Sequence, residues 1–273
     1  MAALARASSL HRRLLLIAAA GIVPVAVAAG LVIYGFYQAQ RQQAERTALE
    51  VTRALSTALD AELRRSIAAL EVVASLADAE DPESLRKPLE QAVATRRGWR
   101  SLVLFDLGGR QLVNTRVPAG QPLPPTVQRD TIDAVARTGK PVVGHLVRGP
   151  VVDWAVPVRV PVMHEGRVRY VLTAAVAPES LLDVVLRQRL QEGWVVTAVD
   201  ASGARVLRWP RQAEYIGTPV SGTLARMMQG GNAEATGLTT TSEGNDVYTA
   251  FSRSPETGLM RRPATWNLSP TMA

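Results

Sequence analysis

Two stretches of sequence decide the fold: GWRSLVLFDLGGRQLVN (98–114) and GWVVTAVDASGARVLRW (193–209), about 94 positions apart. In each stretch an apolar run follows a Gly-Trp pair and ends at an aspartate, Asp106 or Asp200. A glycine then turns the chain into a second apolar run, which is the pattern of a β-hairpin with Asp and Gly in its tight turn. We expect both aspartates to serve these turns rather than acid–base chemistry. A hairpin repeated at about domain spacing predicts two copies of one small α+β module.

The first part of the chain contains an uncharged, apolar segment at residues 14–37. As a helix it would span about 36 Å, which exceeds the hydrocarbon core of a bilayer at about 30 Å. A cleaved signal peptide is the alternative, because Ala26-Val27-Ala28 resembles a cleavage site. The apolar run continues past that site as far as Tyr37, so we favour an uncleaved membrane helix.

Charges flanking this segment predict its orientation. Arg6, Arg12 and Arg13 precede it without any acidic residue, whereas basic and acidic residues are mixed after it. The positive-inside rule therefore assigns residues 1–13 to the cytoplasm and the bulk of the chain to the outside of the membrane, with a single crossing between them.

The basic character of the chain does not indicate nucleic-acid binding. Its isoelectric point is about 10.5, but residues 38–257 hold 26 Lys and Arg against 24 Asp and Glu. No basic stripe of the kind that neutralises phosphates stands out there. The chain contains no cysteine, so an exported domain has to be held by its core rather than by disulfides.

A long helix is predicted to continue from the apolar segment. Residues 38–79 contain neither Pro nor Gly, and Leu55, Leu59, Leu63 and Ile67 recur every four residues. Such a stripe serves packing on the helix's own domain, and it also serves a parallel dimer stalk. We expect both, and therefore a homodimer formed through this helix.

The remaining elements follow from turn signals and periodicity. We expect helices over 82–97, 127–137, 181–190 and 223–229, and strands over 99–106, 110–115, 141–148, 151–163, 168–177, 194–200, 204–209, 236–241 and 246–252. Pro157 and Pro161 indicate that the strand over 151–163 lies at an edge or beside a bulge. The predicted domains are a cytoplasmic N-terminus (1–13), a transmembrane helix (14–37), two helices (38–97), a membrane-distal module (98–190), a shorter and incomplete membrane-proximal module (191–257) and an irregular tail (258–273).

This combination resembles the double Cache sensor domain, a PAS-like periplasmic domain of bacterial histidine kinases, chemoreceptors and diguanylate cyclases. The resemblance is carried by the strand Leu102–Asp106 with its Gly-Gly turn, the entry Gly139-Lys140-Pro141, the turn His164-Glu165-Gly166 and the turn from Asp200 to Gly203, together with the segment from Arg208 to Gly217. It covers about residues 38–257. It implies an α+β fold with two PAS-like antiparallel-sheet modules, and a small ligand in the membrane-distal one.

Two departures from the family pattern limit what the resemblance implies. The subgroup that binds amino acids carries a Tyr, Arg and Trp-Tyr pattern that has no equivalent between Arg64 and Arg100, so the resemblance does not extend to amino-acid binding. Family members close the second module with a further strand, whereas residues 260–273 show no strand alternation. We therefore expect that the C-terminus was lost through a frameshift or truncation near Thr257.

The sequence contains no recognisable set of catalytic residues. His145 and His164 lack the spacing of a zinc site, and no nucleophile elbow or phosphate-binding loop is present. We expect no cofactor, no metal and no catalytic domain in this chain, although the parent protein is expected to be a histidine kinase or a diguanylate cyclase.

Candidate ligand-binding residues are polar or aromatic side chains on strands that otherwise consist of Val and Leu. These are His145, Arg148, Asp153, Trp154 and Tyr170. An arginine pairs with a carboxylate, and aromatic rings form flat pocket walls, so a carboxylate is one candidate ligand. Trp154 as a core residue and Arg148 as a solvated one are the alternatives for these positions.

The sequence therefore predicts the extracytoplasmic small-ligand sensor region of a membrane-bound receptor, with a two-component sensor histidine kinase favoured, without its output domain. The alternative is a membrane-anchored periplasmic solute-binding or structural protein without signalling output.

Overall fold

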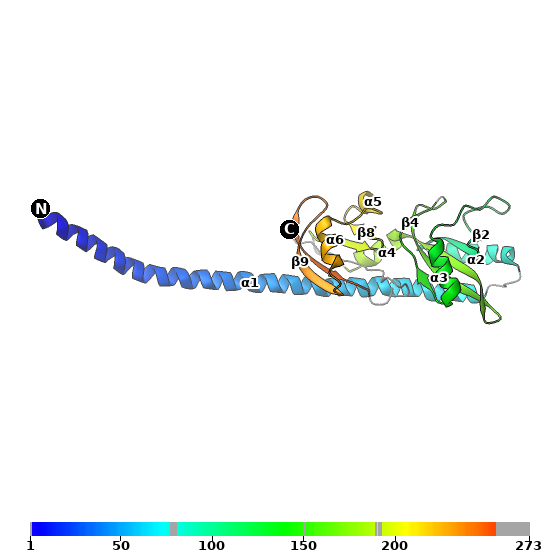
Figure 1. Cartoon of the computed structure of the whole chain (residues 1–273), viewed down its shortest axis with the longest axis horizontal. Coiled ribbons are helices and arrows are strands. Elements are labelled where there is room, and N and C mark those ends of the chain that lie inside the picture. Colours follow the sequence, from blue (N-terminus) through cyan, green and yellow to red (C-terminus); the bar gives the residue numbers. More distant parts are fainter. Residues whose placement is uncertain (1, 77–80, 150, 189, 191–192, 255–273) are drawn as a thin grey trace. The chain divides into compact units, whose positions relative to one another are not determined.

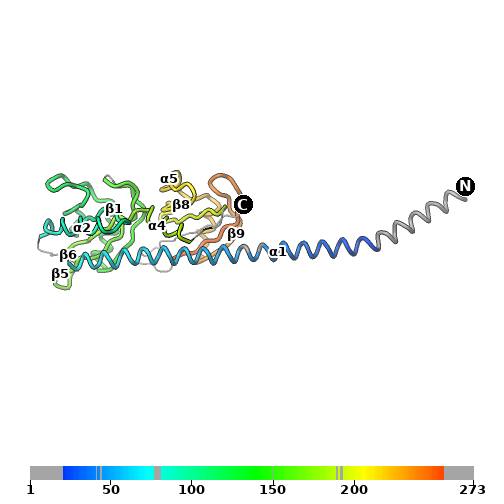
Figure 2. The backbone as a smooth tube through the Cα atoms, turned by 180° about the vertical axis from the view of Figure 1, so that it is seen from behind, coloured from blue at the N-terminus to red at the C-terminus, as the bar shows by residue number. Residues whose placement is uncertain are grey.

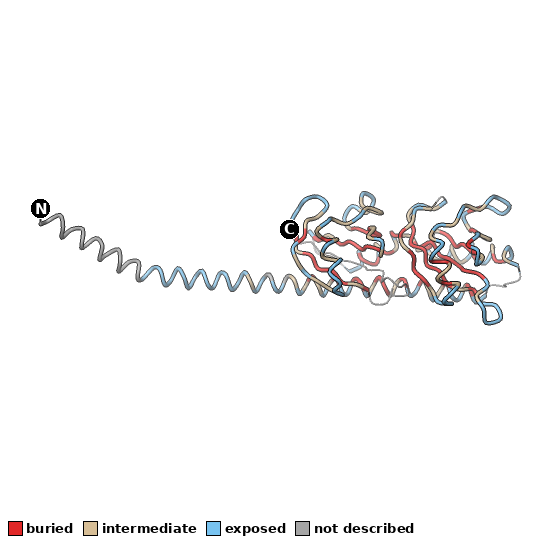
Figure 3. The backbone as a smooth tube through the Cα atoms, viewed as in Figure 1, coloured by how far each residue is buried: buried red, intermediate tan, exposed pale blue. Residues whose placement is uncertain are grey.

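The computed structural model describes residues 2–76, 81–149, 151–188, 190 and 193–254. The chain divides into two units, of which the first ends at Thr47 and contains only the beginning of helix α1 (Ala2–Ser75). From Gly21 onward α1 is long and apolar enough to cross a membrane. Its large apolar side chains between Ile22 and Tyr37 are exposed, as the pale blue part of the tube in Figure 3 shows. This segment presents to its surroundings the surface that lipid requires.

The second unit begins at Ala48 and contains the remainder of α1, which packs on both predicted modules (Figure 1). The predicted stripe of α1 is buried in this unit's main core, at Leu55, Leu59, Leu63, Leu70 and Ala74. Leucines four residues apart lie on one helix face, so one side of α1 supplies the shared floor of the core.

A short segment then turns the chain back. The side chain of Asp81 accepts a hydrogen bond from the Glu83 N–H at 3.1 Å and caps the 3₁₀ turn η1 (Pro82–Leu85), which leads into α2 (Arg86–Thr95). Proline at the first position of such a turn loses no hydrogen bond, because that N–H has no partner inside the turn.

The membrane-distal module contains one six-stranded sheet with the order β2-β1-β6-β5-β3, and β4 also pairs with β5. Its strands are β1 (Trp99–Asp106), β2 (Gln111–Asn114), β3 (Val142–Val143), β4 (Val147–Arg148), β5 (Trp154–His164) and β6 (Arg167–Val176). Helices α1 and α2 contribute to the core on one face of the sheet, which takes up Leu102, Leu104 and Val160. The other face packs against α3 (Arg129–Thr138) through Val103, Phe105 and Ile132.

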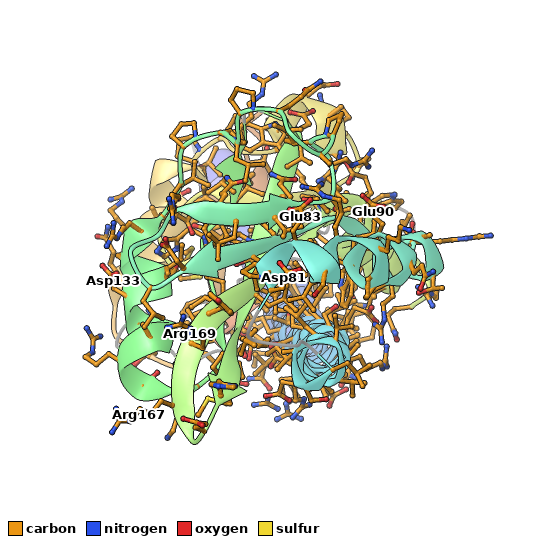
Figure 4. The ribbon with its side chains drawn as sticks, turned by 90° about the vertical axis from the view of Figure 1, so that its right-hand side faces the viewer. Asp81, Glu83, Glu90, Asp133, Arg167 and Arg169 are labelled. Atoms are coloured by element: carbon orange, nitrogen blue, oxygen red, sulfur yellow. The ribbon has the colours of Figure 1, made fainter. Side chains whose placement is uncertain are left out.

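Figure 4 looks onto the far end of this module and shows that charged side chains gather there. The labelled Asp81, Glu83 and Glu90 come from the segment around η1 and from α2, whereas Arg167 and Arg169 come from β6. All five are exposed. The sheet beneath them is buried on both faces, so the charged end and the apolar interior are clearly separated.

The second module is built from two hairpins that form separate two-stranded sheets (Figure 2). Its elements are α4 (Pro178–Leu186), β7 (Val196–Val199), β8 (Arg205–Trp209), α5 (Gln212–Tyr215), α6 (Gly222–Gln229), β9 (Glu234–Thr240) and β10 (Asp246–Ser252). Val196, Ala198, Val206 and Leu207 join the same core as the leucines of α1.

The two hairpins quoted from the sequence use the same turn. The side chain of Asp106 accepts a hydrogen bond from the Arg110 N–H at 2.8 Å, and Asp200 Oδ1 accepts from the Ala204 N–H at 3.1 Å. Gly109 and Gly203 have φ of 83° and 89°, a left-handed conformation that side chains disfavour. The predicted role of both aspartates is confirmed, and with it the repeat.

The predicted strand over 141–148 is wrong in detail, because the structure breaks it into β3 and β4 around Gly144. The side chain of Gln128 forms hydrogen bonds with both the N–H and the C=O of His145 and so takes this residue out of the ladder. The helix predicted over 181–190 ends at Leu186, because its buried apolar face stops at Val185. The strand containing Pro157 lies next to the edge and is covered there only by these two short strands.

The predicted fold class, an α+β chain with a long amino-terminal helix and antiparallel-sheet modules, is confirmed. The domain boundaries stay predictions. The irregular tail at 258–273 and the proposed loss of the C-terminus lie outside the described residues.

Candidate functional site

A cavity of about 70 Å³ lies on the α3 side of the membrane-distal sheet. Strands β1, β2, β5 and β6 form its floor, and two loops, one before α3 and one between β4 and β5, cover it. The polar side chains in its lining are Ser101, Gln111, Asn114, Arg159 and Thr173, and the remainder of the lining is mostly Val, Pro and Ala. Apolar walls with a few polar groups are typical of small-molecule sites.

The strand register brings three of these polar groups into one row across the sheet. Arg159 on β5 pairs with Thr173 on β6, which pairs with Val103 on β1, which in turn pairs with Asn114 on β2. Directly opposed residues lie on the same face of an antiparallel sheet, about 5 Å apart at Cβ. The guanidinium-bearing residue, the hydroxyl and the amide therefore share the floor of the cavity.

Arg159 is the largest of the fully buried side chains described, with 1% of its surface exposed. Its Nη2 donates to the Val127 carbonyl oxygen at 3.1 Å, whereas Nε and Nη1 have no partner among the described residues. Burial lowers the pKa of Arg159 to about 10, with the carboxylate of Asp130 acting in the opposite direction. The guanidinium is thus charged at neutral pH, and two of its nitrogens face no acceptor of the protein.

The hydroxyl next to Arg159 is also without a partner. Thr173 Oγ1 is buried and makes no hydrogen bond. Buried polar groups of folded proteins are almost always hydrogen-bonded, so each exception needs an explanation. A cation and a hydroxyl without hydrogen-bond partners thus line the same cavity. Together they form a site for a group that accepts hydrogen bonds and carries negative charge.

Three of the sequence-predicted residues lie together beside this cavity. Arg148 Nε donates to Asp153 Oδ1 at 3.1 Å, and the guanidinium carbon of Arg148 lies 5.9 Å from the centre of the Trp154 ring. Their neighbours Val147 and Ala155 line the cavity, but these three side chains do not. They cluster at its margin, and the Arg148 side chain is 70% exposed.

The other two predicted residues lie elsewhere. The backbone of His145 is held by Gln128, and the side chain of Tyr170 is buried in the core on the α1 side of the sheet. The sequence prediction missed Arg159, although a signal was present: it is the one charged residue in the run Val156–Val162. All five predicted residues stay predictions as ligand contacts.

The segments on either side of the β4–β5 loop, which covers the cavity, are linked to the second module at two points, one at Leu146 before β4 and one at Trp154 at the start of β5. The Leu146 N–H donates to Asp200 Oδ2 at 2.8 Å, and this aspartate belongs to the β7–β8 turn. Trp154 packs over Gly217, where an added Cβ would lie 2.3 Å from the ring. A movement of this loop therefore reaches the second module directly.

Among the described residues, no group of three or more His, Cys, Asp or Glu is placed to hold a metal ion. The cavity likewise brings together no nucleophile with a base.

Comparison with known proteins shows similarity of structure. No family model and no curated protein matches the sequence. The extracellular domain of rpHK1S-Z16, named as a histidine kinase, superposes with a TM-score of 0.64 at 14% identity over 85% of this chain and 95% of that one. The ligand-binding domain of the amino-acid chemoreceptor PctB of Pseudomonas aeruginosa PAO1, in complex with L-Arg, gives 0.64 at 16% identity over 84% and 96%.

A third similar structure is the ligand-binding domain of the Pseudomonas fluorescens chemoreceptor CtaA in complex with L-isoleucine, with a TM-score of 0.63 at 14% identity over 86% of this chain and 94% of that one. The chain thus has the fold of extracellular ligand-binding domains of histidine kinases and chemoreceptors. At the level of the fold, the resemblance predicted from the sequence is confirmed.

Proposed function

We propose that this chain is the extracytoplasmic sensor region of a membrane-bound receptor and that it binds a small organic anion in the membrane-distal module. The observation that carries the proposal is the buried guanidinium of Arg159, which lines the cavity with two unpartnered nitrogens. A buried charge without a partner is costly, and a carboxylate is the group whose geometry matches a guanidinium best. The cavity has room for several water-sized groups, which favours a short acid.

Arg148, Asp153 and Trp154 are proposed to act at the margin of this cavity. Their mutual ion pair and ring contact support this role, since they hold the loop that covers the site. In this proposal Arg159 binds the anionic group, and the margin controls access to it.

The proposed ligand response is a shift between two packings of the covering loop. A ligand favours the state to which it binds better, by no more than its difference in affinity. The hydrogen bond of Leu146 to Asp200 and the contact of Trp154 with Gly217, on either side of this loop, support a response that passes to the second module and from there to α1.

The apolar part of α1 is proposed to anchor the chain in a bacterial inner membrane, with residues 1–13 in the cytoplasm and the second unit in the periplasm. The basic residues before the apolar segment support this orientation. We further propose a homodimer formed through α1. Leu55, Leu59 and Leu63 are buried in the chain's own core, so the contact between the two copies of α1 is proposed on the opposite side of the helix. The exposed residues there include Ala54, Ala68 and Val72.

The anion proposal is tested by titrating the full chain in detergent with short mono- and dicarboxylic acids and with their uncharged amides. We expect at least one acid to bind and its amide not to bind. Arg159→Met should weaken binding at least 30-fold, because truncating one partner of a desolvated charge pair costs about 2–5 kcal/mol. Arg167→Met, which removes an exposed arginine from the neighbouring strand, is the matched control and should bind as the wild type does.

Equal binding of acid and amide, or unchanged affinity in Arg159→Met, would contradict the proposal.

The dimer is tested separately with single cysteines, which are unique in this cysteine-free chain. Ala68→Cys should cross-link between chains under oxidation, whereas Ser202→Cys on the distant β7–β8 turn should not.

A further inference from the structure

A second group of buried arginines lies in the membrane-proximal module, away from the proposed ligand site. Arg205 and Arg208, both on β8, are 5% and 2% exposed. Their guanidinium carbons lie 5.3 Å and 3.9 Å from the centre of the Tyr215 ring, so both cations are gathered around one aromatic side chain. Two like charges in a buried environment repel each other, and such an arrangement requires compensation.

Arg205 is held only by uncharged acceptors. Its Nη1 donates to Thr218 Oγ1 at 2.8 Å and to the Pro219 carbonyl at 2.6 Å, and its Nη2 donates to Ser242 Oγ at 2.5 Å. No carboxylate among the described residues forms an ion pair with it, and its Nε is buried without a partner. Burial and the neighbouring Arg208 both lower the pKa of Arg205.

Arg208 has one acidic partner, which it shares. Its Nη2 donates to Glu243 Oε1 at 2.6 Å, and the same oxygen accepts hydrogen bonds from Arg211 and from the Tyr215 hydroxyl. Arg208 Nη1 is buried and has no partner. Arg211 also pairs with Glu214 at 3.6 Å. Three guanidiniums thus face two carboxylates, and the cluster retains one positive charge.

A small cavity of about 30 Å³ adjoins this cluster. Arg205 and Arg208 line it together with hydroxyl-bearing residues from four segments, namely Thr197, Ser221, Thr239, Thr240, Thr241, Ser242 and Thr249. The cavity also includes Leu224 of the first turn of α6, an end at which a helix carries partial positive charge. Nine of the twelve residues that line the cavity carry a guanidinium or a hydroxyl, and its volume suits a group of about one or two water molecules in size.

We propose that this cavity binds a small monovalent anion, such as a halide or formate, between Arg205, Arg208 and the hydroxyls of the β9–β10 hairpin. The anion neutralises the remaining positive charge and accepts hydrogen bonds from the free N–H groups of both arginines. In this way it links β8 to the turn after β9. The site is independent of the organic-anion site at Arg159, which lies in the other module.

The test uses thermal unfolding of the full chain in detergent, followed by tryptophan fluorescence, at constant ionic strength. Sodium gluconate, whose anion is too large for the cavity, is replaced stepwise by sodium chloride or by sodium formate. We expect the Tm to rise by about 3–6 °C between 1 and 100 mM chloride and to go on rising with the logarithm of the chloride concentration, as for one site on the folded state. Comparison of the two salts tells whether the site prefers a halide or a carboxylate.

Arg205→Met should abolish the dependence of the Tm on chloride. Arg226→Met is the matched control, because it removes an exposed arginine of the same module that does not line the cavity, and it should keep the dependence. If Arg205→Met fails to fold, the broadening of the ³⁵Cl resonance by the wild-type chain, and its reversal by excess bromide, report the site without any variant.

Three results would overturn the proposal. An equal Tm in chloride and gluconate, together with an unbroadened ³⁵Cl resonance, would mean that the cavity holds only water. A chloride effect that persists in Arg205→Met would place the anion elsewhere. A chloride effect lost in Arg159→Met but kept in Arg205→Met would assign it to the membrane-distal cavity, and would leave the proposed organic-anion site intact.

Discussion

The two modules bury arginines in different ways. Arg159 stands alone on a sheet buried on both faces, with one hydrogen bond to a carbonyl and a cavity of about 70 Å³ beside it. Arg205 and Arg208 both lie against the Tyr215 ring, their side chains donate four hydrogen bonds to their neighbours and to Glu243, and their cavity is about 30 Å³.

This difference distinguishes a site with room for a ligand from a site whose arginines hold neighbouring segments together. A cation with few protein contacts contributes little to folding and is free to contact a ligand. Cations that join β8 to two other segments by hydrogen bonds stabilise them, and their removal leaves the acceptors unsatisfied. In our proposals the membrane-distal arginine serves ligand recognition, whereas the membrane-proximal pair serves to hold its module together. Four predictions probe this contrast, starting from the contact that joins the two regions.

The largest effect is expected at the contact between the modules. Gly217→Ala should lower the free energy of unfolding by about 2–4 kcal/mol, because the new Cβ collides with Trp154 and because alanine is strained at a φ of 76°. Urea unfolding measures the loss.

The control for this prediction is Gly203→Ala. Gly203 has a similar φ of 89°, but nothing lies within 4 Å of its added Cβ, so only the backbone strain of about 1–2 kcal/mol remains. Equal losses at the two glycines would mean that the Trp154 contact does not hold the modules together, and Trp154→Ala should rescue part of the loss at Gly217 only.

The second prediction is that the same substitution, Arg to Met, changes the free energy of unfolding in different ways at the two sites. Arg205→Met should destabilise the chain by about 2–3 kcal/mol, since three neutral acceptors lose a charged donor. Arg159→Met should leave stability unchanged or raise it by about 1 kcal/mol, since an apolar side chain replaces a poorly paired buried charge. Both are measured by urea unfolding without added organic acids. A loss at Arg159 as large as that at Arg205 would remove the distinction between the two sites.

Much of the fold could be predicted from the sequence because it depends on local patterns. The Asp-Gly turns at Asp106 and Asp200 and the leucine stripe of α1 are set by neighbouring residues, and the structure contains them as expected. The break of the third strand could not be predicted, because it depends on Gln128, which is 17 residues distant from His145.

The sites were harder to predict for a physical reason. A strand buried on both faces carries no alternation that tells an inner from an outer residue. Arg148 and Arg159 are therefore equivalent in the sequence, although the first is 70% exposed and the second is buried. The proximal cluster joins Arg208 to Glu243 over 35 positions, a contact that only the tertiary structure creates.

The third prediction is a response to acid at the proximal cluster. Burial alone would raise the pKa of Glu243, but hydrogen bonds from Arg208, from its own backbone and from Thr241 lower it to about 2. A carboxyl with a depressed pKa in the folded state stabilises that state above its ordinary pKa of 4.5, and this stabilisation is lost as the pH falls from about 4.5 towards 2.

The measurement for this prediction is the urea midpoint between pH 6 and pH 3. Glu243→Gln should be less stable than the wild type at pH 6, and the difference should shrink at pH 3. Glu165→Gln, at the exposed β5–β6 turn, should leave the profile unchanged. If the two variants behave alike, Glu243 is not the acid that balances Arg208.

The smallest effect is expected at Arg148, the arginine that the sequence favoured. Its only ionic partner among the described residues is Asp153, and both side chains are mainly solvated, so the pair contributes at most about 1 kcal/mol. Arg148→Ala should therefore weaken binding of the best organic acid less than about fivefold, by loosening the margin of the cavity, whereas Arg159→Met weakens it at least 30-fold. Titrations of both variants with the same acid decide between the two arginines. A larger loss for Arg148→Ala would move the anion to the cavity margin, and the buried guanidinium of Arg159 would then be a structural cation like the pair in the other module.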